Sequence, residues 1–86
     1  MYEWDEEKNQ DNLANHGLSF EDAKLVLSGP CVNFDDDRFD YDEDRYLTLG
    51  LLQGRVVLIA YTWREDRIRI ISMRKAMRRE QEIYQK

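Results

Sequence analysis

The fold is decided by the stretch RYLTLGLLQGRVVLIAYTWREDRIRIIS, residues 45–72. It contains three runs with a composition typical of strands, at residues 45–52, 55–63 and 67–72. The pair Gln53 and Gly54 suits a tight hairpin turn, and REDR at residues 64–67 suits a second turn. Strands joined by turns this short must be antiparallel. The run VVLIAY is apolar on both faces, so we predict that it forms the central strand.

Two helices are predicted ahead of this stretch. Asp5 can cap the first helix, which runs through EEKNQDNLANH and ends at Gly17. Ser19 can cap a second helix over FEDAKLVLS, and Gly29 followed by Pro30 ends it. Two short helices in succession indicate a helical hairpin that opens around Gly17.

The remaining segments complete an α+β pattern. Residues 2–4 form a strand-like opening, CVNFDD begins another strand at Cys31, and a helical pattern resumes from about Lys75. We therefore predict a single domain over residues 1–86. It should have two N-terminal helices and a C-terminal helix on one face of a mainly antiparallel four- to five-stranded sheet.

The composition indicates a small globular domain in a reducing compartment. The chain has 86 residues, is 42% hydrophobic and 36% charged, and has a net charge of -5. It contains no apolar run of about 18 residues, and its first segment, MYEWDEEKNQ, is unlike a signal peptide. The single cysteine, Cys31, cannot form an internal disulfide and is expected to be a small buried hydrophobe. We therefore expect a cytoplasmic protein.

The charges are unevenly distributed along the chain. Seven of the 13 Lys and Arg residues lie within residues 64–79, whereas residues 35–44 hold seven acids against one arginine. The acidic segment lacks the spacing of a calcium-binding loop, so it favours a charged hairpin or a patch for a basic partner over a metal site. The basic segment is either a phosphate-binding surface or a solvated face paired with the protein's own acids.

Alternation along residues 67–72 divides the side chains of this strand between two faces. Ile68 and Ile70 share one face, and Arg67 and Arg69 share the other. If the isoleucines face the helices, the arginines line the open face of the sheet. Basic residues at positions 74–79 then extend this surface at the start of the last helix. The planar guanidinium group suits phosphate oxygens well.

Few residues suit acid–base chemistry. The sequence shows no phosphate-binding loop, dinucleotide-binding turn, zinc spacing or Ser–His–Asp arrangement. His16 is the only histidine, and its alternative role is to cap the helix that it ends. Lys8 precedes it by a little over two turns and so lies on a similar face. RNA cleavage by transesterification needs groups that take the 2′-OH proton, stabilise the phosphorane and protonate the 5′-oxygen.

Three segments of the chain resemble the BrnT family of toxins. WDEEKNQDNLANHGLSFEDA, which begins at Trp4, is similar to the family's N-terminal signature of Trp-Asp, Lys, Asn and His-Gly. DEDRYLTLG is similar to its Glu-x-Arg strand that ends in glycine, and RIRIISMRKAMRREQEIY is similar to its C-terminal signature. The segments occur in the family's order and cover nearly the whole chain.

The resemblance implies a ribonuclease toxin of a bacterial type II toxin–antitoxin system, with a RelE-like fold and no cofactor. Such a toxin is a metal-independent endoribonuclease that cleaves RNA and inhibits translation. A BrnA-like antitoxin with a ribbon-helix-helix DNA-binding domain is also implied. The expected complex is a heterotetramer with a toxin on each side of an antitoxin dimer, which reaches operator DNA only through the antitoxin.

The resemblance and the charge pattern together assign two groups of site residues. The predicted catalytic residues are Arg64, Arg69, Arg74, Lys8 and His16. The predicted RNA-binding residues are Arg67, Ser72, Lys75, Arg78 and Arg79. Trp4 and Tyr84 also fall on family-like positions and are expected to pack the core, and Asn12 is expected to cap a helix or tie a loop.

The sequence also departs from the family's pattern. Asn15 stands where a lysine is common before His-Gly, Phe39 stands where relatives often carry a histidine, and Met73 replaces the usual alanine. The loss of two basic positions and the net acidity favour an alternative. In that alternative, a catalytically attenuated toxin-like protein acts as a co-repressor or scaffold with a DNA-binding partner.

Overall fold

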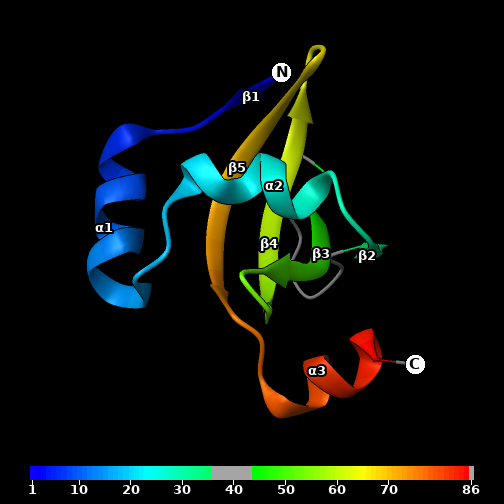
Figure 1. Ribbon diagram of the computed structural model, residues 1–86. Coiled ribbons are helices and arrows are strands. Elements are labelled where there is room, and N and C mark those ends of the chain that lie inside the picture. Colours follow the sequence, from blue (N-terminus) through cyan, green and yellow to red (C-terminus); the bar gives the residue numbers. More distant parts are fainter. Residues whose placement is uncertain (36–43, 86) are drawn as a thin grey trace.

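The computed structural model describes residues 1–35 and 44–85. Three helices, a short 3-10 helix and five strands form an α+β fold, with the strands in one sheet in the order β1-β5-β4-β3-β2 (Figure 1). The strands are β1 (Tyr2–Glu3), β2 (Cys31–Asp35), β3 (Tyr46–Leu52), β4 (Arg55–Arg64) and β5 (Arg67–Lys75). The predicted α+β class is confirmed, but the N-terminal part holds one helix of 11 residues and a short one of five in place of the two predicted helices.

The sheet is antiparallel except at one edge. β2, β3, β4 and β5 pair in antiparallel fashion, with β4 at the centre as predicted, whereas β1 pairs with β5 in parallel. Gln53 and Gly54 form the turn between β3 and β4 with φ values of 52° and 80°. Two consecutive positive φ values match the right-handed twist of the flanking strands, which explains the tight hairpin.

The first helix, α1 (Glu6–His16), has the predicted ends. The Asp5 carboxylate accepts hydrogen bonds from the N–H groups of Glu7 and Lys8, and Gly17 adopts the left-handed conformation at φ 68°. Both features satisfy backbone groups that the helix itself leaves without partners. None of the helices within residues 1–35 and 44–85 is long and apolar enough to cross a membrane.

The second predicted helix is divided into two short elements. A 3-10 helix, η1 (Phe20–Asp22), precedes α2 (Ala23–Leu27). Ser19 caps it as predicted, by accepting a hydrogen bond from the N–H of Glu21. The backbone N–H of Phe20 donates a hydrogen bond to Oδ1 of Asn9 on α1 at 2.8 Å. The sequence therefore predicted the start of this segment correctly but overestimated the length of its α-helix.

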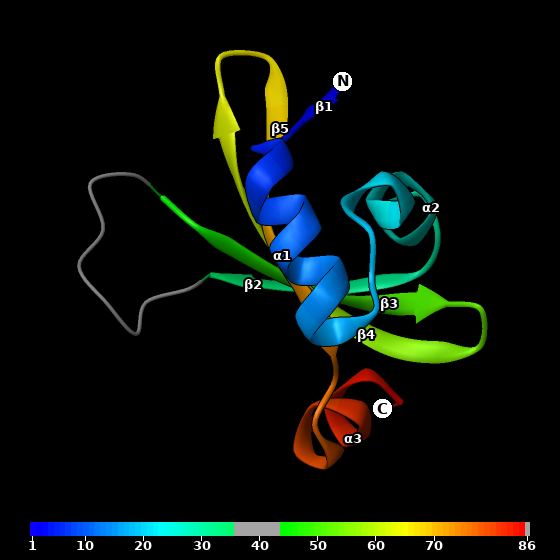
Figure 2. The same ribbon diagram turned by 90° about the vertical axis from the view of Figure 1, so that its left-hand side faces the viewer.

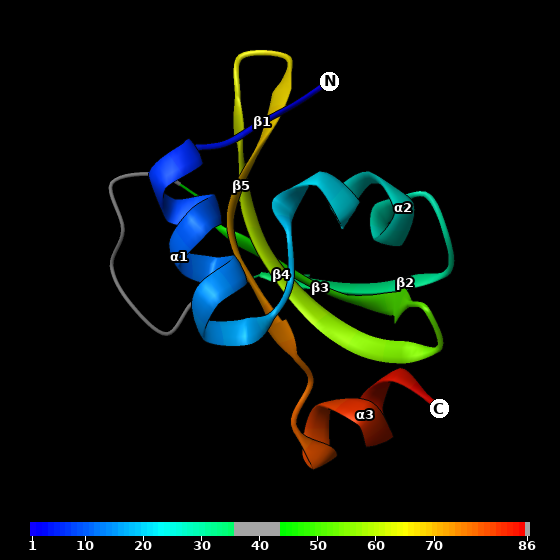
Figure 3. The same ribbon diagram turned by 60° about the vertical axis from the view of Figure 1, so that its left-hand side comes forward.

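Helices pack on both faces of the sheet, which corrects the prediction of a single covered face. Val57 and Ile59 lie on the face under η1 and α2 (the α2 face), where Phe20 and Val26 complete the core. The opposite face (the α3 face) carries a second apolar cluster that includes Leu58. Figure 3 shows α2 and α3 on opposite sides of β3 and β4. The two-sided burial follows from the apolar residues on both faces of β4.

The last strand continues further than predicted and the last helix begins later. β5 extends to Lys75, which pairs with Val57, and the N–H of Ala76 still donates to the carbonyl of Val56. The helix α3 (Arg78–Tyr84) therefore starts three residues beyond the predicted start at Lys75. As a result, Arg74 lies on a strand and not at the start of a helix.

Candidate functional site

A β-bulge places four arginines of β4 and β5 on one face. Ile70 pairs with Tyr61 and Ser72 pairs with Ala60, so Ile71 is an extra residue in β5. Without this extra residue, Arg69 and Ser72 would point to opposite faces because they are an odd number of residues apart. Paired residues share a face, so the α3 face carries Ser72 and four arginines, which we call the arginine row: Arg64, Arg67, Arg69 and Arg74.

Glu3 on β1 forms ion pairs with Arg67 and Arg69, the two arginines at the start of β5. The parallel pairing of β1 with β5 places Glu3 opposite Arg69, whose Nη1 donates to the Glu3 carboxylate at 2.8 Å. Arg67 lies 3.6 Å from the other oxygen of the same carboxylate. The hydrogen bond from Arg69 lowers the pKa of Glu3 below its ordinary value of 4.5, with smaller contributions from the charges of Arg69 and Arg67.

Glu80 on α3 forms an ion pair with Arg74, the arginine near the end of β5. The guanidinium of Arg74 donates to both carboxylate oxygens of Glu80, at 2.8 and 2.9 Å, and to the carbonyl of Lys75 at 3.2 Å. Glu80 also accepts a hydrogen bond from the N–H of Met77, which caps α3. A guanidinium has five N–H donors, so Arg74 keeps two for a ligand. Glu80 therefore orients Arg74 and still leaves it able to bind.

Asn12 attaches α1 to the part of β5 that β1 leaves unpaired. The side chain of Asn12 accepts a hydrogen bond from the backbone N–H of Met73 at 3.2 Å and donates to the carbonyl of Leu18 at 2.9 Å. Figure 2 shows α1 running alongside β5. The prediction that Asn12 ties a loop is confirmed, and it also attaches a helix to the sheet.

The five predicted catalytic residues do not meet at one point. Lys8 and His16 lie on α1, separated along its axis by about 12 Å at 1.5 Å per residue. His16 lines a hollow on the α2 face together with Leu52, Val57 and Lys75. The three predicted catalytic arginines belong to the arginine row on the α3 face. The structure thus places Lys8 and His16 on α1, beside β5, and the arginines on the sheet itself.

The predicted RNA-binding residues are also divided between two surfaces. Arg67 and Ser72 lie on the α3 face, whereas Lys75 pairs with Val57 and lies on the α2 face. Arg78 and Arg79 are exposed in the first turn of α3. The basic surface therefore continues from the sheet onto α3, but it also turns around the end of β5.

Two aromatic residues of the family-like positions pack as expected. Trp4 packs edge-on against Phe20, with ring centroids 6.4 Å apart and planes inclined by 79°. Tyr84 packs against the apolar cluster of the α3 face, and its hydroxyl donates to the carbonyl of Pro30 at 3.0 Å. Both residues therefore hold elements together and are not candidates for chemistry.

Cys31 is half-buried beside α2. Its thiol lies 3.1 Å from the carbonyl oxygen of Val26 and 3.3 Å from that of Gly29. Burial raises the pKa of the Cys31 thiol above its ordinary value of 9.0. A thiol that stays protonated near neutral pH is a poor nucleophile, so Cys31 takes no part in the site.

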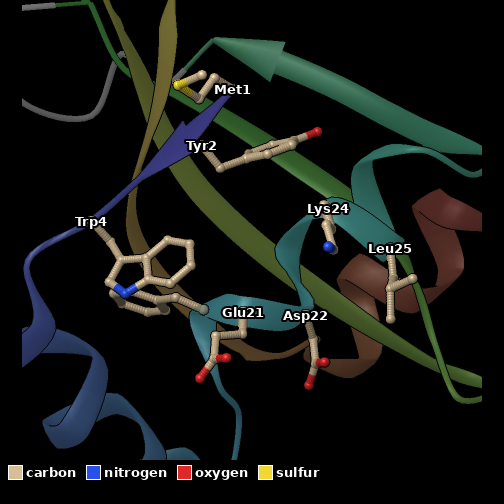
Figure 4. Close-up of a pocket in the computed structure, with 8 residues that line it drawn as sticks. Met1, Tyr2, Trp4, Glu21, Asp22, Lys24 and Leu25 are labelled. Atoms are coloured by element: carbon tan, nitrogen blue, oxygen red, sulfur yellow. The ribbon is translucent and has the colours of Figure 1, made fainter.

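A hollow near the N-terminus has an acidic rim. Its volume is about 630 Å³, and Figure 4 shows Tyr2, Trp4 and Leu25 around it. The carboxylates of Glu21 and Asp22 point to the same side of this hollow. Lys24 also lines the hollow, but the two carboxylates outnumber this one cation and disfavour a phosphodiester backbone there.

Sequence reasoning missed the two acids that hold the arginine row. Glu80 occupies the third position of α3, where an acid that caps the helix is common, so this role had a local signal. The role of Glu3 had none, because it depends on the pairing of β1 with a strand far along the chain. The predictions for the acidic segment, including Phe39, concern residues 36–43 and lie outside the described residues.

Comparison with known proteins identifies one family. A family model described as "Ribonuclease toxin, BrnT, of type II toxin-antitoxin system" matches residues 4–80. No curated protein matches the chain. The match spans the four strands β2, β3, β4 and β5 but not β1, and it includes every residue of the arginine row.

Proposed function

We propose that this chain, which belongs to the BrnT family of ribonuclease toxins of type II toxin–antitoxin systems, cleaves RNA and so inhibits translation. The observation that supports this proposal is the arginine row, which the bulge at Ile71 brings onto one face. We also propose a RelE-like fold and a metal-independent transesterification, both of which are implied by the resemblance to the BrnT family.

In this reaction the arginine row binds and stabilises the charged phosphorane. Arg69 uses one Nη1–H for Glu3, and Arg74 uses three of its N–H groups for Glu80 and the carbonyl of Lys75. The remaining donors face the α3 side of the sheet and can contact phosphate oxygens. Donors that are already oriented need little reorganisation as negative charge develops in the transition state.

Proton transfer is assigned to α1, where Lys8 and His16 lie about 12 Å apart along the helix axis, so that only one of them can act at a given phosphodiester. Lys8 and His16 are exposed side chains of the helix that Asn12 attaches to β5. An RNA strand that lies over the arginine row and crosses the edge of β5 would bring its ribose towards α1. Contacts along this path come from the predicted RNA-binding residues Arg67, Ser72, Lys75, Arg78 and Arg79.

The partner is an antitoxin that covers the same surface. We propose a BrnA-like protein with a ribbon-helix-helix domain, in a heterotetramer with a toxin on each side of the antitoxin dimer. Operator DNA then binds through the antitoxin alone, and the complex acts in the cytoplasm. Binding of this partner should raise the melting temperature, because a ligand that binds only the folded state stabilises it.

A second candidate function is a toxin-like scaffold or co-repressor that has lost catalysis. The pairing of Arg67, Arg69 and Arg74 with the protein's own acids favours it, because these pairs reduce the positive potential of the row. A scaffold would still bind the antitoxin but would leave RNA intact.

Induced expression in bacteria separates the two functions. Expression of the chain alone should arrest growth and fragment cellular RNA, and expression together with the antitoxin gene should prevent both effects. Arg69→Ala and Arg74→Ala variants serve as controls that retain the fold but lose the phosphate contacts. Undamaged RNA and normal growth at a confirmed level of folded protein would support the scaffold instead.

A further inference from the structure

A second group of cationic side chains surrounds a hollow on the α2 face of the sheet. The hollow has a volume of about 380 Å³ and is lined by His16, Gly17, Leu18, Leu52, Gln53, Arg55, Val57 and Lys75. Two residues of this lining, Arg55 and Lys75, are positively charged. The hollow is comparable in size to sites that hold small ligands.

Three separate elements build this hollow. Arg55 follows the tight turn and pairs with Leu52, and Lys75 ends β5 and pairs with Val57. Leu52 and Val57 belong to the core of the α2 face, so both cations lie on that face, opposite the arginine row. His16 reaches the hollow from the last turn of α1.

The cations of the hollow are not neutralised by the protein. Within residues 1–35 and 44–85, the side chains of His16, Arg55 and Lys75 make no hydrogen bond or ion pair. The lining contains no Asp or Glu from this part of the chain. The carbonyl end of α1 contributes a partial negative charge of about half a unit, which two full positive charges exceed. The lining of the hollow therefore carries a net positive charge.

Arg55 and Lys75 also border a neighbouring hollow. This second hollow has a volume of about 520 Å³ and lies beside α3, with Val56, Ala76 and Tyr84 in its lining. It too contains no acid from the described residues. The two cations therefore stand between two hollows, one towards α1 and one towards α3. An extended anionic chain can pass around this end of the sheet and remain near both of them.

We infer that the hollow between α1 and the β3–β4 turn binds a phosphate group of the RNA backbone, with Arg55 and Lys75 as its ligands. This assignment of the ligand as RNA rests on the proposed function. The guanidinium and ammonium groups contact the phosphate oxygens, and the apolar floor formed by Leu18, Leu52 and Val57 accommodates the adjacent ribose or base. In this proposal Arg55 binds a phosphate group, and the RNA contacts both the arginine row on the α3 face and the hollow on the α2 face.

Nuclear magnetic resonance on the purified chain tests occupancy of the hollow. The probe is a short oligoribonucleotide that is 2′-O-methylated throughout, which cannot be cleaved by transesterification. His16 is the only histidine, so its ring signals are unambiguous. We expect the oligonucleotide to shift these signals and the amide signals of Gly17 and Gly54. Inorganic phosphate should shift the same signals only at much higher concentration.

Charge-matched variants test the ligands. Arg55→Gln and Lys75→Gln each remove one positive charge from the hollow, and Lys24→Gln removes one from the exposed surface of α2. We expect each of the first two to weaken oligonucleotide binding about 10-fold, as expected for one charge-assisted contact. Each should also reduce the slope of log affinity against log salt by about 0.7. Lys24→Gln should change the affinity far less, and thermal melts verify that all three variants fold.

The outcomes also separate this inference from the proposed function. Signals of His16, Gly17 and Gly54 that stay fixed while the chain still cleaves RNA would overturn the inference and leave the function intact. Shifts with inorganic phosphate but none with the oligonucleotide would likewise overturn it, because the site would then hold a free anion. Shifts that disappear in Arg55→Gln would sustain it even if the chain proves unable to cleave RNA.

Discussion

The two basic regions of this molecule differ in how their charges are compensated. In the arginine row, Arg67, Arg69 and Arg74 are paired with Glu3 or Glu80. In the hollow on the opposite face of the sheet, Arg55 and Lys75 have no acidic partner within the described residues. A count of basic residues along the sequence emphasises the first region, whereas the structure adds the second.

The difference suggests a division of labour. Arginines that are held by carboxylates have fixed orientations, which suits the stabilisation of a transition state. Cations without partners keep their full charge and flexible side chains, which suits the capture of a phosphate backbone.

Asn12→Ala should detach α1 from β5 and so affect the hollow but not the arginine row. The substitution leaves the backbone N–H of Met73 and the carbonyl of Leu18 without their partner. Two such losses at a buried site cost about 2–4 kcal/mol of unfolding free energy. Because α1 carries His16, oligonucleotide binding in the hollow should weaken while the arginine row stays in place. Urea unfolding measures the first effect and chemical-shift mapping the second.

Asn15→Ala is the matched control for this prediction. It makes the same substitution on an exposed position of the same helix, three residues later. Alanine is the better helix former, so this variant should be as stable as the parent or slightly more stable. Equal unfolding midpoints for the two variants would contradict the role assigned to Asn12.

Glu80→Gln should leave Arg74 without an acidic partner among the described residues, as Arg55 and Lys75 are in the hollow. It removes the charge that holds Arg74 and weakens the cap of α3. The pair is partly exposed, so we expect a loss of only about 1 kcal/mol in unfolding free energy. RNA affinity should rise about 3-fold because the charge of Arg74 is no longer neutralised by Glu80. The cleavage rate of bound RNA should fall because the guanidinium of Arg74 is no longer held in a fixed orientation.

Glu82→Gln provides the control, because it removes an equal charge from an exposed position of α3. The two variants are compared by RNA binding at several salt concentrations and by single-turnover cleavage. Identical affinities and rates would show that Glu80 neither masks nor orients Arg74.

Glu3→Gln should alter the acid sensitivity of the protein. The pKa of Glu3 is lowered from 4.5 in the folded state, chiefly by the hydrogen bond from Arg69. The folded state therefore binds the proton less readily than the unfolded state, and Glu3 contributes stability above pH 4.5. This contribution is lost as the pH falls through the lowered pKa. Melting temperatures between pH 7 and pH 3 should consequently decline less steeply in Glu3→Gln than in the parent. Parallel curves would contradict the pairing of Glu3 with Arg69.

Local signals explain which parts of the fold the sequence predicted. The Gln53–Gly54 turn, the Asp5 and Ser19 caps and the central strand each depend on residues that are close in sequence. The start of α3 was predicted too early because the residues from Ser72 to Lys75 suit a strand or a helix. Only pairing with β4 decides between the two.

The candidate site depended on contacts that local patterns do not contain. Alternation predicted that Arg67 and Arg69 share a face, but it would have placed Ser72 on the other one. The bulge at Ile71 reverses that assignment and becomes visible only in the strand register. The hollow was missed because His16, Arg55 and Lys75 come from three distant segments that the fold brings together.

Single-turnover cleavage at saturating protein tests the central claim most directly, namely that the arginine row performs the chemistry. Arg64→Ala, Arg69→Ala and Arg74→Ala are compared with the parent and with Lys24→Gln, and thermal melts are recorded on the same samples. The account predicts that each arginine variant stays folded, binds RNA and cleaves it about 100-fold more slowly, the loss typical of one donor to an oxyanion. Arg→Lys changes should restore only part of the rate, because an ammonium group cannot replace the planar fork. Folded variants that all cleave at the parent rate would contradict it and favour the scaffold.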